Sequence, residues 1–443
     1  MKLPTDVQIC LEALERASFA TYAVGGCVRD HLLGLTPQDF DLCTAATPEQ
    51  MQAVFSHRQP VLAGVKHGTV GVVTDGGVVE ITTFRTEGGY ADGRHPDWVR
   101  FVPDIEADLA RRDFTVNAMA WSPTRGFADP FGGRTDLKNK VLRAVGDPET
   151  RFREDALRIL RGARFATKYR LEPETKTEEA MLCLAPLMDG LARERVFDEL
   201  CKLIVLAEAD DLIRFAPIIT QVIPELKAAV GFDQRSPHHA YDLFTHIAHV
   251  TASVPRDLTL RWAALLHDVG KVPTFTTDEN GRGHFYGHAR ESARIANEIL
   301  LRLKAPTALR EQVVHLAELH MTKPEPDRKL LRRWLSRYST ETMDQLLLLQ
   351  EADMGSKGTG HREEGEIFPK VRAILEEIKA ENACLRIRDL AIDGRDLMDL
   401  GFVPGKALGA CLAHLLEQVL DEQLPNERQA LLTAAQSIKE ERT

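Results

Sequence analysis

The sequence lacks several features that would place it in a specialised class of protein. No apolar run approaches the roughly 20 residues that cross a bilayer, so no membrane-spanning helix is expected. The first residues, Met1 to Asp6, are too polar for a secretory signal. The seven cysteines are scattered without a Cys-x-x-Cys pair, so neither a disulfide framework nor a zinc ribbon is expected. We therefore expect a cytoplasmic protein with no membrane partner.

The sequence also lacks an excess of positive charge, since 66 acidic residues outnumber 56 Lys and Arg and the formal net charge is −10. Binding to the phosphates of a nucleic acid needs local positive potential rather than a positive total. Basic residues cluster at Arg111–Arg112, within residues 151–170 and within residues 328–337. The composition therefore neither demands nor excludes a nucleic-acid partner.

The pattern along the chain indicates several domains, because 443 residues are too many for one core. Internal repeats and low-complexity tracts are absent. Short β-rich runs alternate with helical patterns up to about residue 145, and helical patterns dominate from Phe152 onward. We predict an α+β protein with a mixed α/β head (1–145), a helical neck (146–230), a histidine-rich helical body (231–355) and a helical tail (356–443).

Two short motifs near the N-terminus suit a site for metal ions and phosphates. Gly26 is the second of two glycines between a β-rich run and a helical run, so the backbone there can approach a phosphate, and Arg29 can pair with a triphosphate. We expect Asp39 and Asp41 to share one face of a strand, with Phe40 turned into the core. Two such oxygen ligands suit Mg²⁺ bound together with substrate phosphates.

Four motifs follow one another in the head and the neck. They are Gly25-Gly26-x-x-Arg29-Asp30 with Asp39-x-Asp41, Arg111-Arg112-Asp113-Phe-Thr-Val-Asn117, Asp129-Pro-Phe-Gly132-Gly133-x-x-Asp136, and Glu154-Asp155-x-x-Arg158-x-x-Arg161. In order and spacing they resemble the motifs of class II tRNA nucleotidyltransferases. That family belongs to the DNA polymerase beta superfamily and includes bacterial CCA-adding enzymes and poly(A) polymerases. The resemblance implies addition of the 3′-terminal CCA to tRNA from CTP and ATP.

The resemblance also implies roles for individual residues. Asp39 and Asp41 are the expected catalytic residues and ligands of two Mg²⁺ ions, and Arg111 is expected near the ribose and triphosphate. The expected nucleotide-binding residues are Gly26, Arg29, Arg112, Asp113, Asn117, Asp155, Arg158, Arg161 and Arg164.

In the family, the pair matched by Asp155 and Arg158 reads the edge of the incoming base. Residues three apart on a helix share a face, and the carboxylate would accept from the exocyclic amine of C or A while the guanidinium donates to a ring nitrogen or carbonyl. An ordinary surface ion pair between the two residues is the alternative.

Further segments bear on which enzyme of the family this is. Glu80, in a strand expected beside that of Asp39, is a candidate third carboxylate. Gly64-Val-Lys66-His67-Gly68 resembles the CCA-adding enzymes, whereas poly(A) polymerases typically carry a Gly-Arg-Arg-Phe-like segment there. Enzymes that add only CC lack an intact flexible loop, and residues 85–96 resemble a complete one. A poly(A) polymerase, and a tRNA-binding hydrolase with an inactive head, remain as alternatives.

Histidines and aspartates of the body predict a second metal site. His246, the pair His267-Asp268 and the distal Asp353 resemble the ligand set of HD phosphohydrolases, which suits a transition metal. Two more histidines, at positions 288 and 320, are candidates to extend the site. The resemblance implies hydrolysis of 2′,3′-cyclic or 2′-phosphate ends, and a decayed site that only helps to bind tRNA is the alternative.

Two segments near the C-terminus are candidates to contact tRNA. The glycine-rich stretch 401–409 with Lys406 suits either a phosphate or close helix packing, and its resemblance to the tail of CCA-adding enzymes favours RNA. The basic helix predicted over residues 328–337 suits either the acceptor stem or a solvated face. The oligomeric state has no signal in the sequence.

Overall fold

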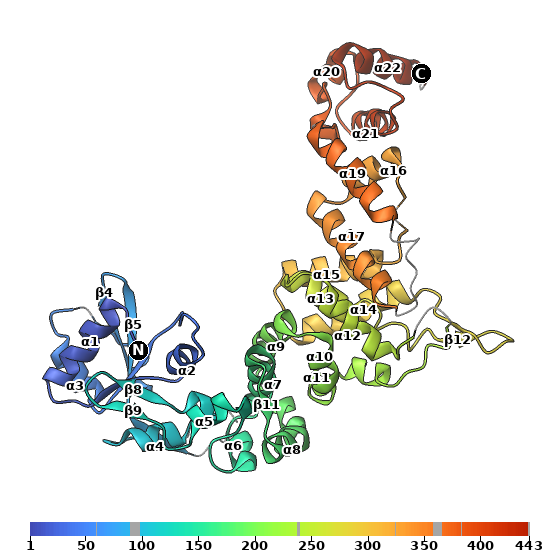
Figure 1. The fold of residues 1–443 in the computed structure, drawn as a ribbon. Helices are drawn as coiled ribbons and strands as arrows, with labels where there is room; N and C mark the ends of the chain where they lie inside the picture. Colours follow the sequence, from blue (N-terminus) through green and yellow to red (C-terminus); the bar gives the residue numbers. More distant parts are fainter. Residues whose placement is uncertain are drawn as a thin grey trace. The chain divides into compact units, whose positions relative to one another are not determined.

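The computed structural model describes residues 1–58, 60–88, 98–236, 240–323, 325–357, 366–381 and 383–441. These residues form two compact units. The first contains residues 1–227 with 302–305, and the second contains residues 228–301 with 306–443. Figure 1 labels the elements of both, and each unit is described by itself.

A seven-stranded sheet forms the centre of the head, in the order β3-β4-β5-β2-β1-β8-β9. Its middle strand β2 (Asp41–Thr44) is parallel to β5 (Gly77–Thr83) and antiparallel to β1 (Thr21–Val24). The remaining strands are β3 (Pro60–Val61), β4 (Thr69–Thr74), β8 (Ala120–Ser122) and β9 (Gly126–Ala128). Apolar residues of the central strands bury together with Phe84 and Leu109, which forms the core beneath the site. The predicted mixed α/β head is confirmed.

Short helices flank this sheet. They are α1 (Thr5–Arg16), α2 (Gly26–Leu32), α3 (Pro48–Val54), α4 (Ile105–Ala110) and α5 (Gly133–Lys138), with the 3₁₀ turns η1 (Val65–His67) and η2 (Thr115–Asn117). A separate ribbon pairs β6 (Arg85–Gly88) with β7 (Trp98–Phe101). Helix α2 begins just after β1 ends, and η2 lies just before β8 begins. Because β1 and β8 are antiparallel, the polar residues of α2 and η2 lie at the same end of the sheet.

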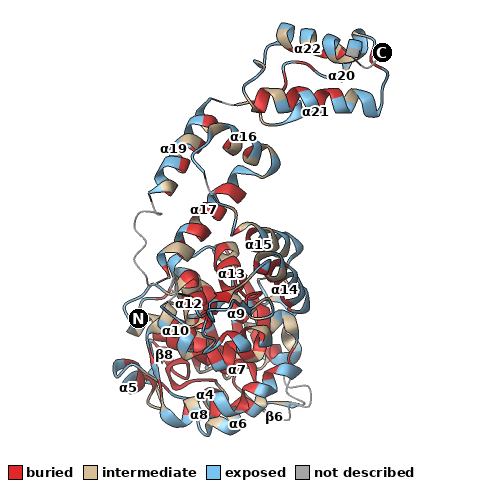
Figure 2. Ribbon diagram, turned by 90° about the vertical axis from the view of Figure 1, so that its right-hand side faces the viewer, coloured by how far each residue is buried: buried red, intermediate tan, exposed pale blue. Residues whose placement is uncertain are grey.

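The neck is helical and continues the first unit. It contains α6 (Pro148–Glu154), α7 (Leu157–Tyr169), α8 (Thr175–Leu184), α9 (Arg193–Leu206), α10 (Ala209–Arg214) and α11 (Ala216–Val222), with η3 (Ala185–Gly190) and η4 (Pro224–Ala229). Two short strands, β10 (Val141–Leu142) and β11 (Glu172–Pro173), pair in parallel. Helix α7 packs against α9, with buried residues at helical spacing on both (Figure 2).

The second unit is helical apart from the two-residue strands β12 (Thr276–Thr277) and β13 (Gly283–His284). Its helices are α12 (Leu243–Ser253), α13 (Leu258–Leu266), α14 (His288–Arg302), α15 (Thr307–Leu319), α16 (Arg328–Arg337), α17 (Thr340–Gly355), α19 (Ile367–Ala380), α20 (Gly394–Asp399), α21 (Lys406–Leu420) and α22 (Arg428–Glu441), with η5 (Ile387–Asp389). One apolar core joins α16, α17 and α19, and another joins α20, α21 and α22. Within the described ranges, every helix is too short or too polar to cross a membrane.

Candidate nucleotide and metal sites

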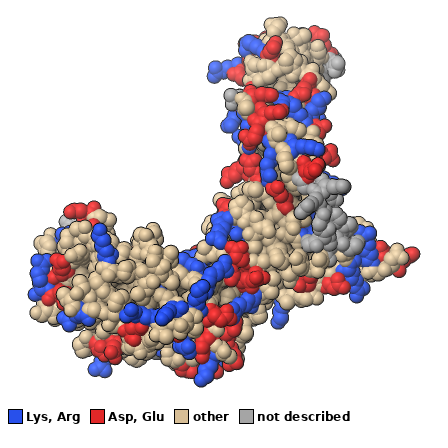
Figure 3. Space-filling view, viewed as in Figure 1, with Lys and Arg blue, Asp and Glu red and all other residues tan. Residues whose placement is uncertain are grey.

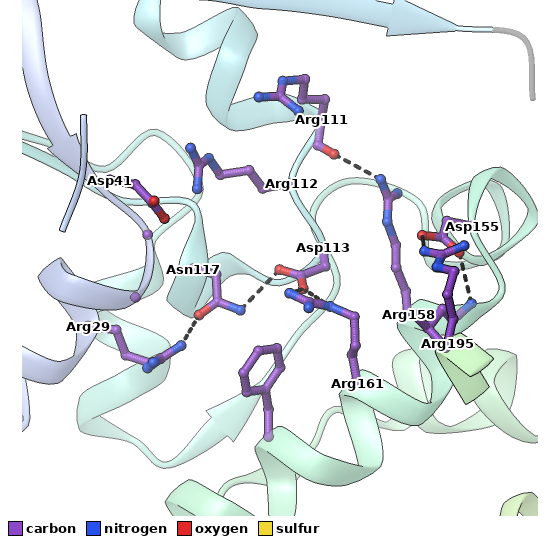
Figure 4. A pocket seen from close by; sticks show the side chains of 14 residues that line it. Arg29, Asp41, Arg111, Arg112, Asp113, Asn117, Asp155, Arg158, Arg161 and Arg195 are labelled. Carbon is purple, nitrogen blue, oxygen red and sulfur yellow. Dashed lines mark hydrogen bonds and ion pairs between the residues drawn. The ribbon is translucent and has the colours of Figure 1, made fainter. Parts of the chain in front are cut away.

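A pocket of roughly 460 Å³ opens in the first unit between the sheet edge and α7. Six arginines and three aspartates line it: Arg29, Arg111, Arg112, Arg158, Arg161, Arg195, Asp41, Asp113 and Asp155. Figure 4 shows their side chains converging from α2, α7, α9 and the segments beside these helices. Figure 3 shows Lys and Arg side chains gathered in a band across this unit. The excess of guanidinium groups gives the pocket a positive potential despite the acidic chain, which suits a polyanionic ligand.

Because Gly25 has no side chain, the guanidinium of Arg112 lies close to it in the pocket. The Gly25 φ of +72° lies in the left-handed region, and its N–H donates to the carbonyl of Met119 at 3.0 Å. A Cβ atom at Gly25 would lie 2.7 Å from Nη1 of Arg112. The positive φ of the turn therefore favours glycine at this position, and a side chain here would displace the Arg112 guanidinium.

A hydrogen-bonded chain crosses the pocket from the head to the neck (Figure 4). Arg29 donates to the amide oxygen of Asn117, and the Asn117 amide donates to Asp113 Oδ1 at 3.0 Å. Arg161 of α7 donates twice to Asp113 Oδ2, at 2.6 and 2.9 Å. Burial raises the pKa of Asp113, but the Arg161 charge and these hydrogen bonds outweigh it and hold the pKa well below its usual range.

Arg29, which begins this series of hydrogen bonds in the head, also contacts a residue of the neck. The Arg29 guanidinium stacks over the Tyr169 ring at 4.1 Å and donates to the Tyr169 hydroxyl. The predicted residues Arg29, Asp113, Asn117 and Arg161 are therefore brought together by contacts between segments far apart in the sequence.

The two predicted metal carboxylates are placed differently from each other. Strand β2 begins at Asp41, so the expectation that Asp39 also lies in the strand is wrong, and Phe40 is only half-buried. Asp41 lines the pocket, and partial burial together with the Asp39 charge raises the pKa of its carboxyl against the opposing effect of Arg112. Both residues are exposed, but Asp39 lies outside the pocket lining. Strand β5 neighbours β2 as predicted, but its Glu80 is exposed and does not line the pocket.

Asp155 and Arg158 both line the pocket, but neither forms the ordinary pair that is the alternative. Asp155 lies at the break between α6 and α7 rather than inside a helix. Its Oδ1 accepts from the Leu157 N–H at 3.0 Å, and its Oδ2 accepts from Arg195 at 2.9 Å. The Arg158 guanidinium instead bonds to Glu154 at 2.7 Å.

Further bonds of Arg158 go to the backbone carbonyls of Arg151 at 3.0 Å and Arg111 at 3.2 Å. Both base-reading candidates are therefore anchored by the protein. Arg195, which lies on α9, escaped the sequence analysis because its partner Asp155 is 40 residues away along the chain.

Arg164, which the resemblance assigns to the nucleotide, lies on α7 outside the residues that line this pocket. Its guanidinium pairs with the buried Glu199 and stacks over Phe165 at 4.2 Å. The pairing with Glu199, which belongs to α9, draws the Arg164 guanidinium toward that helix. Arg111 lines the pocket but is engaged by Asp108 at 2.9 Å and by Glu87 at 3.4 Å.

The second unit gathers the predicted histidine and aspartate residues into one buried cluster. The ligand atoms of His246 (α12), His267 and Asp268 (after α13) and Asp353 (α17) lie within 4.8 Å of one another. Asp268, His288 and His320 form a second group of the same kind. Burial opposes the charge on His267, but the carboxylates of Asp268 and Asp353 prevail and raise its pKa to about 10. The described residues therefore hold two groups with the composition of metal sites.

The packing of α14 explains why His288 reaches this cluster. Gly270, two residues after the His-Asp pair, donates its N–H to Ser292 Oγ at 2.9 Å. A Cβ atom at Gly270 would lie 2.5 Å from the Ser292 backbone nitrogen. The glycine therefore lets α14 approach closely enough to place its first residue beside Asp268.

The candidate tRNA contacts near the C-terminus are engaged within the protein. Lys439 donates to the Leu400 carbonyl at 2.7 Å, and a Cβ atom at Gly401 would lie 2.6 Å from its Nζ, which fits close packing. Three arginines of the basic helix α16 pair with acidic residues: Arg328 and Arg332 with Glu422, and Arg333 with Asp421. The candidate loop over residues 85–96 lies outside the described residues from position 89 onward.

Comparisons with known proteins agree with the sequence motifs. A family model of the poly A polymerase head domain matches residues 21–143, and one of the RNA- and SrmB-binding site of polymerase A matches residues 170–229. A model of tRNA nucleotidyltransferase domain 2 matches residues 288–435.

Relatives that match over nearly the full length identify the family more specifically than these domain models do. The chain is 34% identical to the CCA-adding enzyme of Levilactobacillus brevis over 438 residues, which covers 98% of both chains. It is 31% identical to that of Streptococcus thermophilus over 446 residues, covering 99% of this chain and 98% of the relative. The crystal structure of the Bacillus stearothermophilus CCA-adding enzyme in complex with CTP superposes with a TM-score of 0.72 at 26% identity, over 100% of this chain and 99% of that one.

Proposed function

Because the chain belongs to the family of CCA-adding enzymes, we propose that it adds C, C and A to tRNA in the pocket of the first unit. In this reaction the 3′-hydroxyl of the RNA attacks the α-phosphate of CTP, twice, and then that of ATP, and pyrophosphate leaves. The observation that carries the proposal is the excess of arginines over aspartates around one pocket. Preorganised guanidinium groups stabilise the charge that develops on the phosphates.

We assign the predicted Mg²⁺ ions to Asp39 and Asp41. Asp41 fits this role because its carboxylate lines the pocket at the end of β2, opposite the arginines. Asp39 precedes it by two residues and is accessible to an ion held against the strand end. Bound there, the ions would lower the pKa of the 3′-hydroxyl and stabilise the leaving pyrophosphate. Arg112 and Arg29 would then hold the triphosphate beside these carboxylates and their metal ions.

We assign selection of the base to Asp155 and Arg158. The free lone pairs of Asp155 can accept from an exocyclic amine, which C and A have and U lacks. Arg195 and the Leu157 N–H orient that carboxylate, and Glu154 orients Arg158. Preorganisation of both groups lowers the entropy that binding of the base would otherwise lose.

The first test uses a tRNA transcript that lacks CCA, with Mg²⁺ and CTP alone, ATP alone, or both. Two additions with CTP, and a third only when ATP is present, are expected. A ladder with ATP alone would assign the chain to the poly(A) polymerases. A stop at CC with both nucleotides would mean that A is added by another enzyme.

The metal assignment has its own variant. Asp41→Ala should abolish nucleotide addition while leaving tRNA binding nearly unchanged, as measured by filter binding. Asp75→Ala is the matched control, because Asp75 is an exposed aspartate of the same unit in the turn after β4. Addition that survives in Asp41→Ala would reject the assignment.

A second candidate function is hydrolysis of 2′,3′-cyclic or 2′-phosphate ends of RNA by the cluster in the second unit. The observation that favours it is the burial of His246, His267 and Asp268 together, where a metal ion would activate water for attack on phosphorus. His267→Asn should abolish release of phosphate from such ends and leave CCA addition intact. His315→Asn, on α15 with its ring against Tyr338, is the control. Hydrolysis by His267→Asn at the wild-type rate would reject this function.

A further inference from the structure

Tyr169 is the last residue of α7 in the neck, and its side chain contacts Arg29 on α2 of the head. The Arg29 guanidinium lies over the face of the Tyr169 ring, with 4.1 Å between its Cζ atom and the ring centroid. Its Nη2 atom also donates to the Tyr169 hydroxyl. The contact joins residues 140 positions apart, and none of the four sequence motifs contains Tyr169.

The partners of Arg29 engage most of its hydrogen-bond donors. A guanidinium has five N–H groups in one plane. Asp30 Oδ1 accepts from Nε at 2.9 Å and from Nη2 at 2.7 Å, and the Asn117 amide oxygen accepts from Nη1. With the bond to Tyr169, four of the five N–H groups are engaged among the described residues. Because Arg29 lines the pocket, the remaining N–H on Nη1 is the donor available to a ligand there.

The contact between Tyr169 and Arg29 is shielded from water, since only 6% of the Arg29 side chain is exposed. Shielding strengthens the attraction between a cation and the face of an aromatic ring. Burial and a hydrogen bond to Asp30 outweigh the Arg29 charge and raise the pKa of the Tyr169 hydroxyl to about 12. The hydroxyl therefore keeps its proton at neutral pH and can donate to Asp30 while it accepts from Arg29.

Helix α7 also carries two of the arginines that line the pocket, Arg158 and Arg161. Phe165, four residues before Tyr169 and on the same face of the helix, stacks with its ring at 6.1 Å between centroids. The guanidinium groups of Arg29 and Arg161 lie over Phe165 at 5.4 and 5.2 Å. The two aromatic rings of α7 therefore contact a pocket arginine of the head and one of the neck.

We propose that Tyr169 is a positioning residue for the triphosphate of the incoming nucleotide and acts through Arg29. Its ring and hydroxyl fix the plane of the guanidinium, so that the one unengaged N–H is directed before the nucleotide binds. Because Tyr169 ends the helix that carries Arg158, the contact also fixes the phosphate-binding group relative to the base-reading group. Such preorganisation lowers the entropy that binding loses. The inference rests on the nucleotide addition proposed for this pocket.

Equilibrium binding of CTP with Mg²⁺, and competition by CMP and by pyrophosphate, test the proposal. Tyr169→Phe keeps the ring and should weaken CTP binding about fivefold, and Tyr169→Leu should weaken it about fiftyfold. Pyrophosphate should weaken together with CTP, whereas CMP, which lacks the β- and γ-phosphates, should compete as well as it does with wild type. Tyr22→Phe is the matched control, because Tyr22 lies on β1 of the same unit beside Phe84 and outside the pocket lining.

The dependence on Arg29 is tested in an Arg29→Lys background, where Tyr169→Phe should cause no further loss of CTP binding. In single-nucleotide addition, Tyr169→Phe should raise KM for CTP and retain kcat, since the contact acts on binding. Equal weakening of CTP and CMP, or full CTP affinity in Tyr169→Leu, would overturn the positioning role. The expected binding pattern without any nucleotide addition would keep this role and reject the proposed function, and addition that is indifferent to Tyr169 would do the reverse.

Discussion

At the scale of single residues, Arg195 fixes the position of the Asp155 carboxylate, which we assign to base reading. No sequence motif indicated this role. Its guanidinium reaches Asp155 from α9, and the pair is only partly exposed, with 23% of the Arg195 side chain and 17% of the Asp155 side chain accessible. A free aspartate at a helix break would sample several rotamers. The ion pair restricts them, which implies a contribution of Arg195 to base specificity without contact to the base.

Arg195→Met is expected to lower kcat/KM for CTP by about tenfold, because the loss of a charge-assisted hydrogen bond amounts to about 1.5 kcal/mol. Incorporation of UTP should rise, since Asp155 is no longer oriented toward the amine. Single-nucleotide addition kinetics with CTP and UTP measure both effects. Arg193→Met is the control, because the bond of Arg193 among the described residues goes to the backbone carbonyl of Asp189, four residues earlier. Equal kinetics for the two variants would contradict this role.

The pair of Asp113 and Arg161 gives a prediction about pH. The pKa of Asp113 is lower in the folded protein than its unfolded value of about 3.9, so the pair stabilises the fold above that pH and the contribution is lost as pH falls from there toward the folded pKa. Arg161→Met should therefore reduce the free energy of unfolding by about 1–3 kcal/mol near neutral pH. The difference from wild type should persist down to about pH 4 and shrink below it.

Urea denaturation of both proteins across this pH range is the measurement. Arg153→Met is the control, since Arg153 forms an exposed pair with Glu149 that is expected to add little. A difference between wild type and Arg161→Met that does not vary with pH would mean that packing, not charge, is lost.

At the scale of elements, the turn between β1 and α2 is the most sharply constrained. Gly25 and Gly34 flank α2, and both have a positive φ, +72° and +73°. A Cβ atom at Gly34 meets nothing within 4 Å, whereas one at Gly25 meets Arg112. The two glycines therefore separate backbone strain from displacement of an arginine.

Gly25→Ala should lower nucleotide addition by about a hundredfold, because a shift of the guanidinium by about 1 Å misplaces the triphosphate. Gly34→Ala also places a side chain at positive φ, which costs roughly 1–2 kcal/mol, and should retain nearly full addition. Addition rates compared with melting temperatures of both variants test this. Similar losses of addition in both would mean that strain alone decides.

The sequence predicted the helices and strands better than it predicted the contacts between them. Strand and helix patterns predicted the α/β head, and the motifs predicted most of the pocket lining, because spacing of two and of three to four residues is a local property. The start of β2 at Asp41 and the helix break at Asp155 were missed, since both depend on packing of neighbouring segments. The pairing of Arg164 with Glu199 was not foreseen for the same reason, because Glu199 lies on another helix.

At the scale of the whole molecule, the two units carry separate cores and separate candidate sites. All seven cysteines are free, so no disulfide couples the units in this structure. Structures of this kind commonly unfold in more than one step. Ligands of one unit should therefore stabilise that unit more than the other.

Calorimetry of the full chain is expected to resolve two unfolding transitions. Zn²⁺ at about 100 times its dissociation constant should stabilise the second unit by about 2.7 kcal/mol and shift only one transition. In Asp268→Asn that shift should vanish, while CTP with Mg²⁺ still moves the other transition. A single transition that both ligands move equally would show that the units unfold as one.

The order of strands in the sheet also bears on how the chain matures during synthesis. The strand that carries Asp41 pairs with β5, whose partner residues are 39 positions later, and with β1, which in turn pairs with β8 near residue 120. Such non-local pairing is slow and must wait until the later strands have left the ribosome. The pocket is completed later still, when Arg161 and Arg195 emerge. The head is therefore inactive during synthesis until the neck has been translated. An incompletely synthesised chain cannot add nucleotides to RNA.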